Sequence, residues 1–577
     1  MSLVDFFPAR TIEPEPYQVK PVGKRICTFD SETDPFKEGC IVRPFTCGFY
    51  DTETQEYFDF WGDDCIEQFF EFLDANYSEI ECVIYAHNGG NFDFYFCLDQ
   101  FDDNSKVFIK NGRLSQIFMH GQEFRDSYDC VPVPMDKYKK TRIRYRIFER
   151  DARERPYFKR KIRSYQKDDC VFLSELVVTW LNDFGNRLTM AGVALPMLKS
   201  YHGFECVNEK TDDLIRDYYF GGRVQCFESG ILNDDWKVYD VNSMYPSVMA
   251  SYSHPVSAVA IPQTSIDRDT MFARITADSD GALPLRLDTG GLSFPRGKHD
   301  FYACIHEINA GIETGLLEVL EVHEAYRFEV KSNFAAFVHD FYERRMKARV
   351  EGDTIHDIFF KLVINSSYGK FAQDPRKYET YLFNPDDIPQ PFRCEECYGR
   401  LQSDPNYEHC GNCRAKRSSP FGWYIHTIRD GKIIWARPQR RGGRTRFFNV
   451  ATAASITSAA RAELLKGIAK SVRPIYCDTD SIICRSLDLP SHPDLLGAWK
   501  LEASGDTAAI AGKKLYAVFD QGREIKKASK GVRLTAQQIA RVAAGEVIEY
   551  SDPVPKFHLD GSADIDRKRT IRNTAGL

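Results

Sequence analysis

The sequence predicts an α/β protein built from several domains. A chain of 577 residues is too long for a single hydrophobic core, and two to four domains are usual at this length. Short apolar runs that read as buried strands end in acidic residues at several places, with helical patterns close by. The composition, 43% hydrophobic and 28% charged residues, is that of an ordinary globular protein.

Two other bulk features narrow the class of protein. The sequence contains no apolar run of membrane-spanning length, and its first residues lack the basic-then-apolar pattern of a signal peptide, which predicts an intracellular protein without membrane partners. The 17 cysteines are mostly scattered singly in apolar surroundings. This distribution favours reduced, buried thiols over a disulfide framework.

The net charge of −7 argues against nucleic acid as a partner, but the charge is unevenly distributed. Segments 137–163, 437–446 and 566–572 are strongly basic, and aromatic residues are interspersed in the first. Basic patches with aromatic residues are compatible with a phosphate backbone. Any one patch taken alone is equally compatible with a solvated surface loop.

The first candidate site combines three acidic positions. Asp30 and Glu32 stand two residues apart at the end of an apolar strand, and Asp93 follows a second buried strand and a glycine turn. Tyr165 and Asp169 fall four residues apart, on one face of a predicted helix. If these elements converge, the carboxylates would hold two divalent metals for phosphodiester hydrolysis, with Tyr165 orienting the water. Each carboxylate alone is more typical of a cap or a surface charge.

The second candidate site starts from "IYCDTDSIIC" (475–484), a buried run containing Asp478 and Asp480. Two like charges on one strand face are unfavourable unless a cation lies between them. Asp240 ends another strand, followed by Tyr245 and by Pro246 at the predicted first position of a helix. If the two strands are neighbours, Asp240 and Asp480 would share a metal site, with Tyr245 beside it.

The segment 353–371 predicts a helix closed by Gly369. Lys361, Asn365 and Tyr368 form a polar and aromatic stripe along it. One cation, one amide and one aromatic ring suit a nucleoside triphosphate. A plain amphipathic helix with a solvated face is the alternative.

With both sites laid out, the chain resembles a family B DNA polymerase, of the protein-primed branch found in phages and linear plasmids. The polymerase signatures are "DVNSMYPS", "KLVINSSYG" and "YCDTDS", in the family's order, and the nuclease signatures are "DSE", "HNGGNFD" and "YQKDD". "YFGG" (219–222) matches the branch's linker motif and "KLY" (514–516) its later motif. The resemblance implies a ribonuclease-H-like 3′–5′ exonuclease domain and a right-hand polymerase, and it covers roughly residues 24–532.

Carried over by position, the resemblance implies a role for each residue of the polymerase motifs. Asp240, Asp480 and the Val241 carbonyl would bind two Mg²⁺ or Mn²⁺ ions, helped by Asp478. Tyr245 would exclude a 2′-hydroxyl. Lys361 would hold the dNTP triphosphate, and Asn365 and Tyr368 would line the nascent base pair. The remaining residues would contact DNA: Tyr219, Gly221 and Gly222 the template, Lys514 and Tyr516 the primer end.

In the nuclease module the resemblance implies that Asp30, Glu32, Asp93 and Asp169 bind or support metals, that Tyr165 positions water, and that Asn88 and Ser127 contact single-stranded DNA. Two departures stand out. Tyr128 replaces a leucine that usually follows the serine, and the family's catalytic lysine has no clear counterpart, with Lys159 and Lys161 as candidates. The triphosphate-binding cations ahead of Lys361 are ambiguous among four residues: Arg344, Arg345, Lys347 and Arg349.

The expected domain layout follows the resemblance. The nuclease domain would span 1–195 and the polymerase domain 196–577. Within the latter, the subdomains would be as follows: palm 196–259 and 447–510, a first insertion 260–330, fingers 331–374, a zinc-ribbon-like insertion 375–446 and thumb 511–577. In this branch, two insertions encircle DNA and give processivity with strand displacement.

The second insertion has a signature of its own. Cys394, Cys397, Cys410 and Cys413 have the C-x2-C-x12-C-x2-C spacing of a structural Zn²⁺ site, the alternative being two disulfides. A β-hairpin is predicted directly after it, with Asp430-Gly431 as its turn. We expect this insertion to replace or decorate the second encircling element and to contact DNA or a primer protein.

The sequence therefore predicts a monomeric DNA polymerase in the host cytoplasm that uses a DNA template, a primer, dNTPs and a terminal protein. A catalytically silent, polymerase-like scaffold that binds DNA is the main alternative. A nuclease alone and an RNA-synthesising enzyme are two others, and Tyr245 favours DNA synthesis over the last of these.

Overall fold

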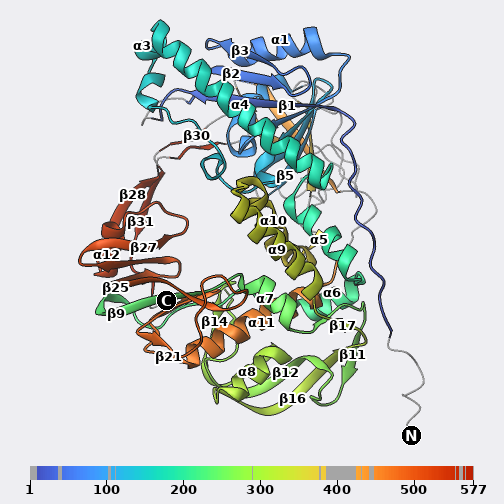
Figure 1. The fold of residues 1–577 in the computed structure, drawn as a ribbon, viewed down its shortest axis with the longest axis vertical. Coiled ribbons are helices and arrows are strands. Elements are labelled where there is room, and N and C mark those ends of the chain that lie inside the picture. Colours follow the sequence, from blue (N-terminus) through green and yellow to red (C-terminus); the bar gives the residue numbers. More distant parts are fainter. Residues whose placement is uncertain are drawn as a thin grey trace, which may run out of the picture.

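A computed structural model describes residues 10–36, 42–101, 105–110, 112–288, 290–375, 447–552, 554–557, 563–565 and 567–575, and the backbone of strands at 379–384, 424–429 and 432–440. The chain forms two main sheets: the ten-stranded sheet lies at the top of Figure 1 and the seven-stranded sheet lower down at the left, above the four-stranded sheet of β12 and β16 at the bottom. We call strands β1–β7 with helices α1–α4 the N-terminal module, and the seven-stranded sheet of the other half the central sheet.

The N-terminal module contributes most of a ten-stranded sheet of order β19-β20-β18-β5-β6-β7-β4-β1-β2-β3. β1 is parallel to β4, and β4 is parallel to β7, whereas the other pairs are antiparallel. Its own strands are β1 (Arg25–Thr33), β2 (Pro44–Asp51), β3 (Glu56–Trp61), β4 (Cys82–Ala86), β5 (Lys106–Lys110), β6 (Arg113–Met119) and β7 (Gln122–Asp126). Its helices are α1 (Cys65–Tyr77), α2 (Asp93–Phe96), α3 (Arg150–Arg153) and α4 (Pro156–Phe184).

Helices cover both faces of this sheet, so its central strands are apolar on both sides. In β4, Val83 and Tyr85 pack into the core that α4 shares, whereas Cys82, Ile84 and Ala86 pack into the core that α1 shares. Successive side chains of a strand point to opposite faces. The same alternation in β1 sends Cys27 and Phe29 toward α1, and Asp30 and Glu32 toward α4.

The central sheet has the antiparallel order β27-β26-β25-β9-β23-β22-β8. Its strands come from distant parts of the chain: β8 (Val224–Cys226), β9 (Gly230–Val241), β22 (Tyr476–Asp478), β23 (Ser481–Cys484), β25 (Trp499–Gly512), β26 (Leu515–Asp520) and β27 (Arg523–Ser529). Helices α7 (Met244–Ser251) and α11 (Val450–Ala469) pack against each other in the same core as Val241, Cys477 and Ile482 of this sheet. Strands 240 residues apart in sequence thus become neighbours.

Residues 260–328 form a separate four-stranded sheet of order β11-β16-β12-β15. Its elements are β11 (Ala260–Gln263), β12 (Thr270–Asp280), β15 (Arg296–Cys304), α8 (Ile305–Glu313) and β16 (Leu317–Phe328). Three two-stranded pairs lie in the same half: β10 (His254–Pro255) with β17 (Lys331–Ser332), β13 (Leu285–Arg286) with β14 (Leu292–Ser293), and β21 (Ser471–Val472) with β24 (Ser486–Leu487).

Helices α9 (Ala335–Glu351) and α10 (Thr354–Phe371) stand between the two halves (Figure 1). α10 packs against α5 (Met190–Tyr201), and α6 (Glu209–Arg216) packs against α11. α5 is continuous through residue 195, where a domain boundary was expected. The expected boundary therefore falls inside a helix.

The C-terminal segment comprises α12 (Ala536–Ala543), β28 (Ile548–Asp552), β29 (Lys556–Phe557), β30 (Ala563–Asp564) and β31 (Arg567–Ile571). β28 pairs with β31, and β29 pairs with β30 to form what we call the C-terminal hairpin. From the central sheet this segment extends toward the N-terminal module, as Figure 1 shows at the left.

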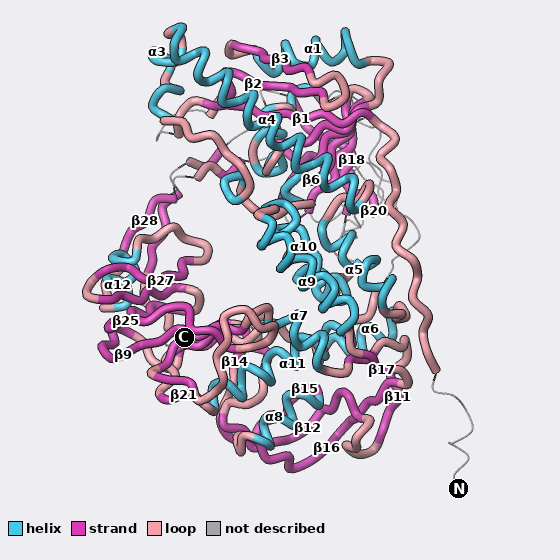
Figure 2. Tube along the Cα trace, in the orientation of Figure 1, coloured by secondary structure: helices cyan, strands magenta, loops and turns pink. Residues whose placement is uncertain are grey.

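The N-terminal strap, residues 10–24, contains no helix or strand and runs from the lower half up to β1 (Figure 2). Arg10 pairs with Glu205 and with Glu329, at 2.7 Å for the latter. At the other end the Tyr17 hydroxyl donates to the Phe184 carbonyl at 2.6 Å. The strap thus connects the two halves.

The structure tests several of the local predictions. The hairpin predicted after the cysteines is confirmed: β19 (Tyr424–Arg429) pairs antiparallel with β20 (Lys432–Arg440). β18 (Glu379–Asn384) links this hairpin to β5, so the insertion extends the N-terminal sheet. The four cysteines of the zinc motif and the turn at 430–431 lie outside the described residues. All described cysteines are free thiols, as expected.

Two helix termini were predicted wrongly. Pro246 is the third residue of α7, not the first; a proline is tolerated throughout the first turn because those N–H groups lack intrahelical partners. Helix α10 continues past Gly369 to Phe371. No helix in the described part of the chain is both long and apolar enough to cross a bilayer.

Candidate active sites

The structure brings Asp240 and Asp480 together at one edge of the central sheet. β9 pairs with β23 so that Asp240 lies opposite Ser481. The N–H of Val241, the last residue of β9, donates to the Asp480 carbonyl at 2.8 Å. Asp240 on β9 and Asp480, which directly precedes β23, are therefore neighbours, although 240 positions separate them in sequence.

The run 475–484 is a hairpin and not a single strand, which corrects the reading of Asp478 and Asp480 as one strand face. β22 ends at Asp478 and β23 begins at Ser481. Thr479 between them has φ 59°, a left-handed conformation that is rare for a β-branched residue. Its N–H donates to the Arg223 carbonyl at 2.7 Å, which holds the turn in place.

The electrostatics of this edge favour a bound cation. Burial, and then the charge of Asp480, raise the pKa of Asp240 to about 7. Burial, and then the charge of Asp478, raise the pKa of Asp480 to about 6. Carboxylates with raised pKa values lack sufficient positive charge around them, and a divalent cation would supply it.

Asp478 has different surroundings from its neighbour. Its carboxylate pairs with Lys514 and accepts hydrogen bonds from the hydroxyls of Thr479 at 3.0 Å and Tyr476 at 3.2 Å. Tyr476 in turn contacts the ring of Tyr516, with centroids 4.8 Å apart. Asp478 thus orients the lysine and, through Tyr476, the tyrosine of the "KLY" motif.

An aromatic pair lies next to the carboxylates. The rings of Tyr245 and Tyr368 stack with centroids 4.2 Å apart and planes 16° from parallel. Gly222 lies against this pair, since a Cβ there would lie 2.9 Å from the Thr479 side chain and 3.2 Å from the Tyr245 hydroxyl oxygen. A Cβ at Gly221 would meet nothing within 4 Å.

Helix α10 presents Lys361, Asn365 and Tyr368 on one stripe, as predicted from the spacing. The Asn365 amide donates to the Lys361 carbonyl at 2.9 Å. Desolvation and the nearby charge of Arg345 lower the pKa of Lys361. This lysine therefore stands in a positive environment, in which an anionic ligand would be stabilised.

Ion pairs distinguish the four cations ahead of this helix. Arg345 and Arg349 both pair with Asp357 of α10, at 2.9 and 3.1 Å, one turn before Lys361. The other two pair within α9 itself: Arg344 with Asp340 and Lys347 with Glu351. Arg345 and Arg349 are thus the two whose side chains reach α10.

The N-terminal module gathers three of its predicted carboxylates. One oxygen each of Asp30, Glu32 and Asp169 lies within 4.8 Å of the others. Burial, then the charge of a neighbouring carboxylate, raise the pKa of Asp30 and of Glu32 well above their usual values. The Asp30 Oδ2 and Asp169 Oδ1 atoms are buried and accept no hydrogen bond from the described residues. This donor set fits divalent metal ions.

Asp93 and Tyr165 lie around this trio. Asp93 accepts hydrogen bonds from the Ser31 N–H at 3.0 Å and hydroxyl at 2.6 Å, so it fixes β1 between Asp30 and Glu32. Burial raises the pKa of Asp93 to about 6. Tyr165 is buried on α4, one turn before Asp169.

The lysine next to these carboxylates is Lys140. Its Nζ lies 3.4 Å from Asp169 Oδ2 and 5.5 Å from the Tyr165 ring centroid. Burial lowers the pKa of Lys140, but the charges of Asp169 and Asp30 raise it more, so the pKa lies above its usual value. Lys159 and Lys161, the two candidates from sequence, instead lie over the rings of Trp61 and Tyr157.

A cavity of about 970 Å³ opens beside the trio. Asn88 lines it, with the left-handed φ of 63° that the glycine turn requires. Ser127 is buried beneath, where its hydroxyl lies 2.9 Å from the His87 Nδ1. Tyr128, the departure from the family pattern, lines the cavity. The Arg113 guanidinium carbon lies over its ring, 4.6 Å from the ring centroid.

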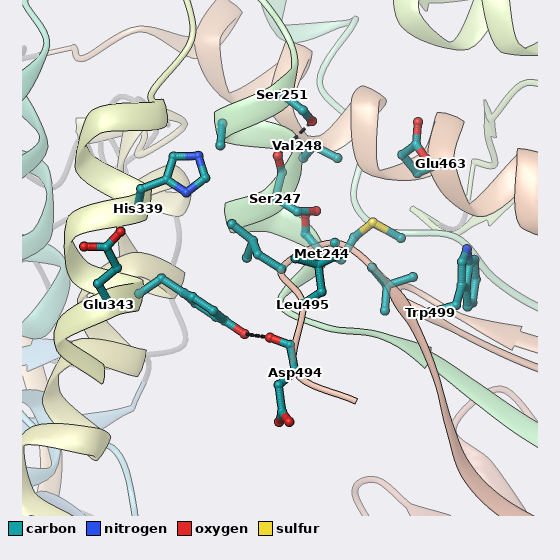
Figure 3. Close-up of a pocket in the computed structure, with 15 residues that line it drawn as sticks. Met244, Ser247, Val248, Ser251, His339, Glu343, Glu463, Asp494, Leu495 and Trp499 are labelled. Carbon is teal, nitrogen blue, oxygen red and sulfur yellow. Dashed lines mark hydrogen bonds between the residues drawn. The ribbon is translucent and has the colours of Figure 1, made fainter. Parts of the chain in front are cut away.

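A second cavity, of about 510 Å³, lies behind α7 and is lined from α9 by His339 and Glu343 (Figure 3). The Tyr342 hydroxyl closes one side by donating to the Asp494 carbonyl at 2.8 Å. This hydrogen bond connects α9 to the loop before β25.

Comparison with known proteins decides the family. Residues 129–407 match the family model described as DNA polymerase type B, organellar and viral. The chain is 40% identical over 587 residues to the DNA-directed DNA polymerase of Enterobacteria phage PRD1, covering 96% of this chain and 99% of that protein. The chain belongs to the type B DNA polymerases.

The polymerase has more distant relatives as well. It is 25% identical to a probable DNA polymerase of Agaricus bitorquis, over 78% of this chain and 66% of that one. Its fold matches that of Phi29 DNA polymerase complexed with primer-template DNA and incoming nucleotide substrates. That match has a TM-score of 0.68 at 17% identity and covers 96% of this chain and 100% of that one, so it concerns the fold alone.

Sequence reasoning missed a buried ion pair that holds the "YFGG" motif of the polymerase. Arg461 of α11 donates to the carbonyls of Phe220 and Gly221, both at 2.8 Å, and pairs with Glu307 of α8 at 2.7 Å. The Arg461 and Glu307 side chains are each 2% exposed. Arg461 directly follows a stretch of mostly small residues, 450–460, that contains no charged residue, and this was the signal that could have found it.

Proposed function

We propose that this DNA-directed DNA polymerase extends a primer 3′-hydroxyl at Asp240 and Asp480 and removes mispaired ends at Asp30, Glu32 and Asp169. The observation that carries the proposal is the juxtaposition of Asp240 and Asp480 beside the Tyr245–Tyr368 stack. Two carboxylates that gain from a cation, next to a flat aromatic surface, suit a metal-bound nucleotide.

At the polymerase site, Mg²⁺ or Mn²⁺ held by Asp240, Asp480 and the Val241 carbonyl would lower the pKa of the primer hydroxyl and neutralise the pyrophosphate. Lys361 binds the triphosphate, and Arg345 and Arg349 keep α10 in place through Asp357. Tyr245 covers the position of the sugar 2′-carbon, while Asn365 and Tyr368 line the base pair. Lys514, held by Asp478, steadies the primer end together with Tyr516.

At the nuclease site, the buried and unpartnered oxygens of Asp30 and Asp169 fit metal ions that would activate water and stabilise the leaving oxygen. Asp93 holds β1 in the position at which Asp30 and Glu32 of that strand face α4. Lys140 and Tyr165 orient the water and the scissile phosphate. Asn88 and Ser127 shape the wall along which the single strand lies. Mispaired ends fray more readily and therefore reach this site more often.

Primer extension with Mg²⁺ and dNTPs tests both sites. We expect Asp480→Asn to abolish synthesis while leaving degradation of single-stranded DNA intact, because the two sites lie on separate sheets. Asp30→Ala should have the opposite effect. A polymerase-like scaffold without catalytic activity would extend no primer, either as wild type or as a variant. Equal synthesis by wild type and Asp480→Asn would refute the polymerase site.

We also propose that the insertion binds one structural Zn²⁺ through Cys394, Cys397, Cys410 and Cys413. The C-x2-C-x12-C-x2-C spacing supports it, and the hairpin that follows extends the N-terminal sheet. Metal analysis should find one zinc ion per chain, and a Cys394→Ser, Cys397→Ser variant should contain none. Zinc retained in that variant would contradict the assignment.

Finally, we infer that the polymerase replicates a phage or mobile-element genome in the host cytoplasm as a monomer, primed by a terminal protein. The "YFGG" and "KLY" motifs support protein priming, and a separate four-stranded sheet formed by residues 260–328 is compatible with the first insertion of that branch. A neighbouring reading frame that encodes a terminal protein is the observation that tests this.

A further inference from the structure

The cavity beside the nuclease carboxylates has walls from both halves of the chain. Asp30, Asp169 and Lys140 of the N-terminal module line one side. The C-terminal segment and the residues before it line the other, with Arg533, Pro555, Lys556, Phe557 and Arg567. The nuclease cavity is therefore completed by a part of the chain that follows the last polymerase motif.

Phe557 fixes the C-terminal hairpin against the N-terminal module. The ring is 7% exposed and belongs to the core that α1 and β4 share. Its centroid lies 5.4 Å from that of Phe92, 5.6 Å from that of Tyr95 and 5.3 Å from that of Phe96. Ala563 and Ile565 pack against the same core. The contact is made by apolar groups removed from water, so we expect this docking to persist at high salt.

The cations on the two walls of the cavity differ in whether acidic side chains of the protein already pair with them. On the nuclease wall, Lys140 pairs with Asp169 and Arg113 pairs with Asp126. On the opposite wall, Arg533 and Lys556 have exposed side chains, and Arg567 pairs with Asp552 at 2.9 Å. A nucleic acid strand approaching Asp30 and Asp169 carries its own negative charge. The exposed cations that offset this charge come from the C-terminal wall.

The remaining lining completes the pattern of a single-strand site. The aromatic rings of Phe36, Phe92 and Tyr128 and the amides of Asn88 and Asn91 face the same cavity. Proteins bind single strands by combining aromatic platforms for the bases with cations for the backbone. The aromatic part lies mainly on the N-terminal module and the cationic part on the C-terminal wall.

We propose that Lys556 and Arg533 bind the phosphates of the single-stranded 3′ end in the nuclease cavity, and that Phe557 holds the C-terminal hairpin in the position this requires. The inference rests on the proposed nuclease function.

The test is degradation of single-stranded oligonucleotides by the full-length protein at several salt concentrations. The Lys556→Ala, Arg533→Ala variant should raise the KM for a ten-nucleotide strand about 5- to 30-fold with kcat within twofold. The slope of log(kcat/KM) against log[salt] should become shallower by about 0.7 for each phosphate contact removed. Hydrolysis of a dinucleotide, too short to reach the hairpin, should be unchanged.

Lys568→Ala is the matched control, since Lys568 is an exposed cation on β31 that does not line the cavity. Phe557→Ala should reproduce the rise in KM and lower the melting temperature, because it removes a buried ring, while primer extension on a matched primer at a temperature below the melting transition stays close to wild type. Phe557→Leu should bring KM most of the way back to the wild-type value. An unchanged KM and salt slope in the double variant would overturn the inference.

A further measurement separates this inference from the proposed nuclease function. Should wild type extend primers but degrade nothing, the nuclease function is wrong. The contribution of the hairpin can still be measured in that case, as the affinity of the Asp30→Ala protein for a fluorescent ten-nucleotide strand in Ca²⁺. There the double substitution should weaken binding about 5- to 30-fold, and equal binding with and without Lys556 and Arg533 would refute their role.

Discussion

At the scale of single residues, backbone conformation decides which side chains meet. Asp478 and Asp480 read as two residues of one strand, yet a turn at Thr479, with φ 59°, leaves Asp478 at the end of β22 and Asp480 just before β23. Asp480 lies beside Asp240, whereas Asp478 pairs with Lys514. Strand propensity predicted a buried strand here but not the turn, because a hydrogen bond to the distant Arg223 carbonyl holds the left-handed threonine.

The same turn makes a prediction for Gly222. Gly222→Ala should reduce primer extension about 10- to 100-fold, because the added Cβ would lie 2.9 Å from Thr479 and displace the turn that carries Asp480. Steady-state extension assays measure this. Gly221→Ala is the matched control: a Cβ there meets nothing within 4 Å, so activity should remain within about twofold. Equal losses in the two variants would contradict the steric explanation.

The nuclease lysine shows the limit of sequence reasoning at this scale. Lys140 precedes Asp169 by 29 positions, and the segment between them contains many other cations. From the sequence the lysine had no clear counterpart, and Lys159 and Lys161, which lie nearer to Tyr165, were named only as candidates. Only the path of the loop before α3 brings Lys140 to within 3.4 Å of Asp169.

At the scale of elements, periodicity predicted much of the architecture. The stripe on α10 and the placement of Tyr165 and Asp169 on α4 follow from helical spacing, and the hairpin of β19 and β20 follows from its turn residues. Sheet order does not follow from such patterns. That β18 would pair with β5 of another module depends on where the two edges meet in space.

Helix α11 illustrates how elements hold the site. Arg461→Ala should destabilise the protein by about 3–5 kcal/mol, because it leaves the buried Glu307 without its partner and frees the carbonyls of Phe220 and Gly221. Thermal melting followed by primer extension measures both effects. An Arg461→Met, Glu307→Leu variant should recover most of the stability but not the activity. Full activity in that double variant would show that the pair does not position the "YFGG" motif.

At the scale of the whole molecule, several contacts among the described residues join the halves of the chain, including an apolar core in which Trp180 and Phe184 of α4 pack against Phe359 of α10. The N-terminal strap, the pairing of β18 with β5 and the docking of Phe557 each link the N-terminal module to the rest. Helix α5 adds a continuous rod between them. This arrangement predicts that the two active sites keep a defined relative position.

The strap is tested at Gly203, where a Cβ would lie 1.9 Å from the Ile12 carbonyl oxygen. Gly203→Ala should dislodge the strap, lower the melting temperature and make residues 10–24 sensitive to limited proteolysis. Gly369→Ala is the control, because its Cβ meets nothing within 4 Å inside helix α10. There alanine should stabilise the protein by about 0.5–1 kcal/mol. A strap equally resistant to protease in both variants would refute its proposed contact.

The sequence by itself determined which chemistry this protein carries. Its carboxylates follow strands, its cation, amide and tyrosine share a helical stripe, and its motifs occur in the order of type B DNA polymerases. Only the tertiary structure decided which carboxylates meet, which lysine lies beside Asp169 and that the C-terminal hairpin lines the cavity next to Asp30 and Asp169. The physical reason is that local patterns encode the period and ends of elements, whereas packing between distant strands and helices sets the distances over which charges act.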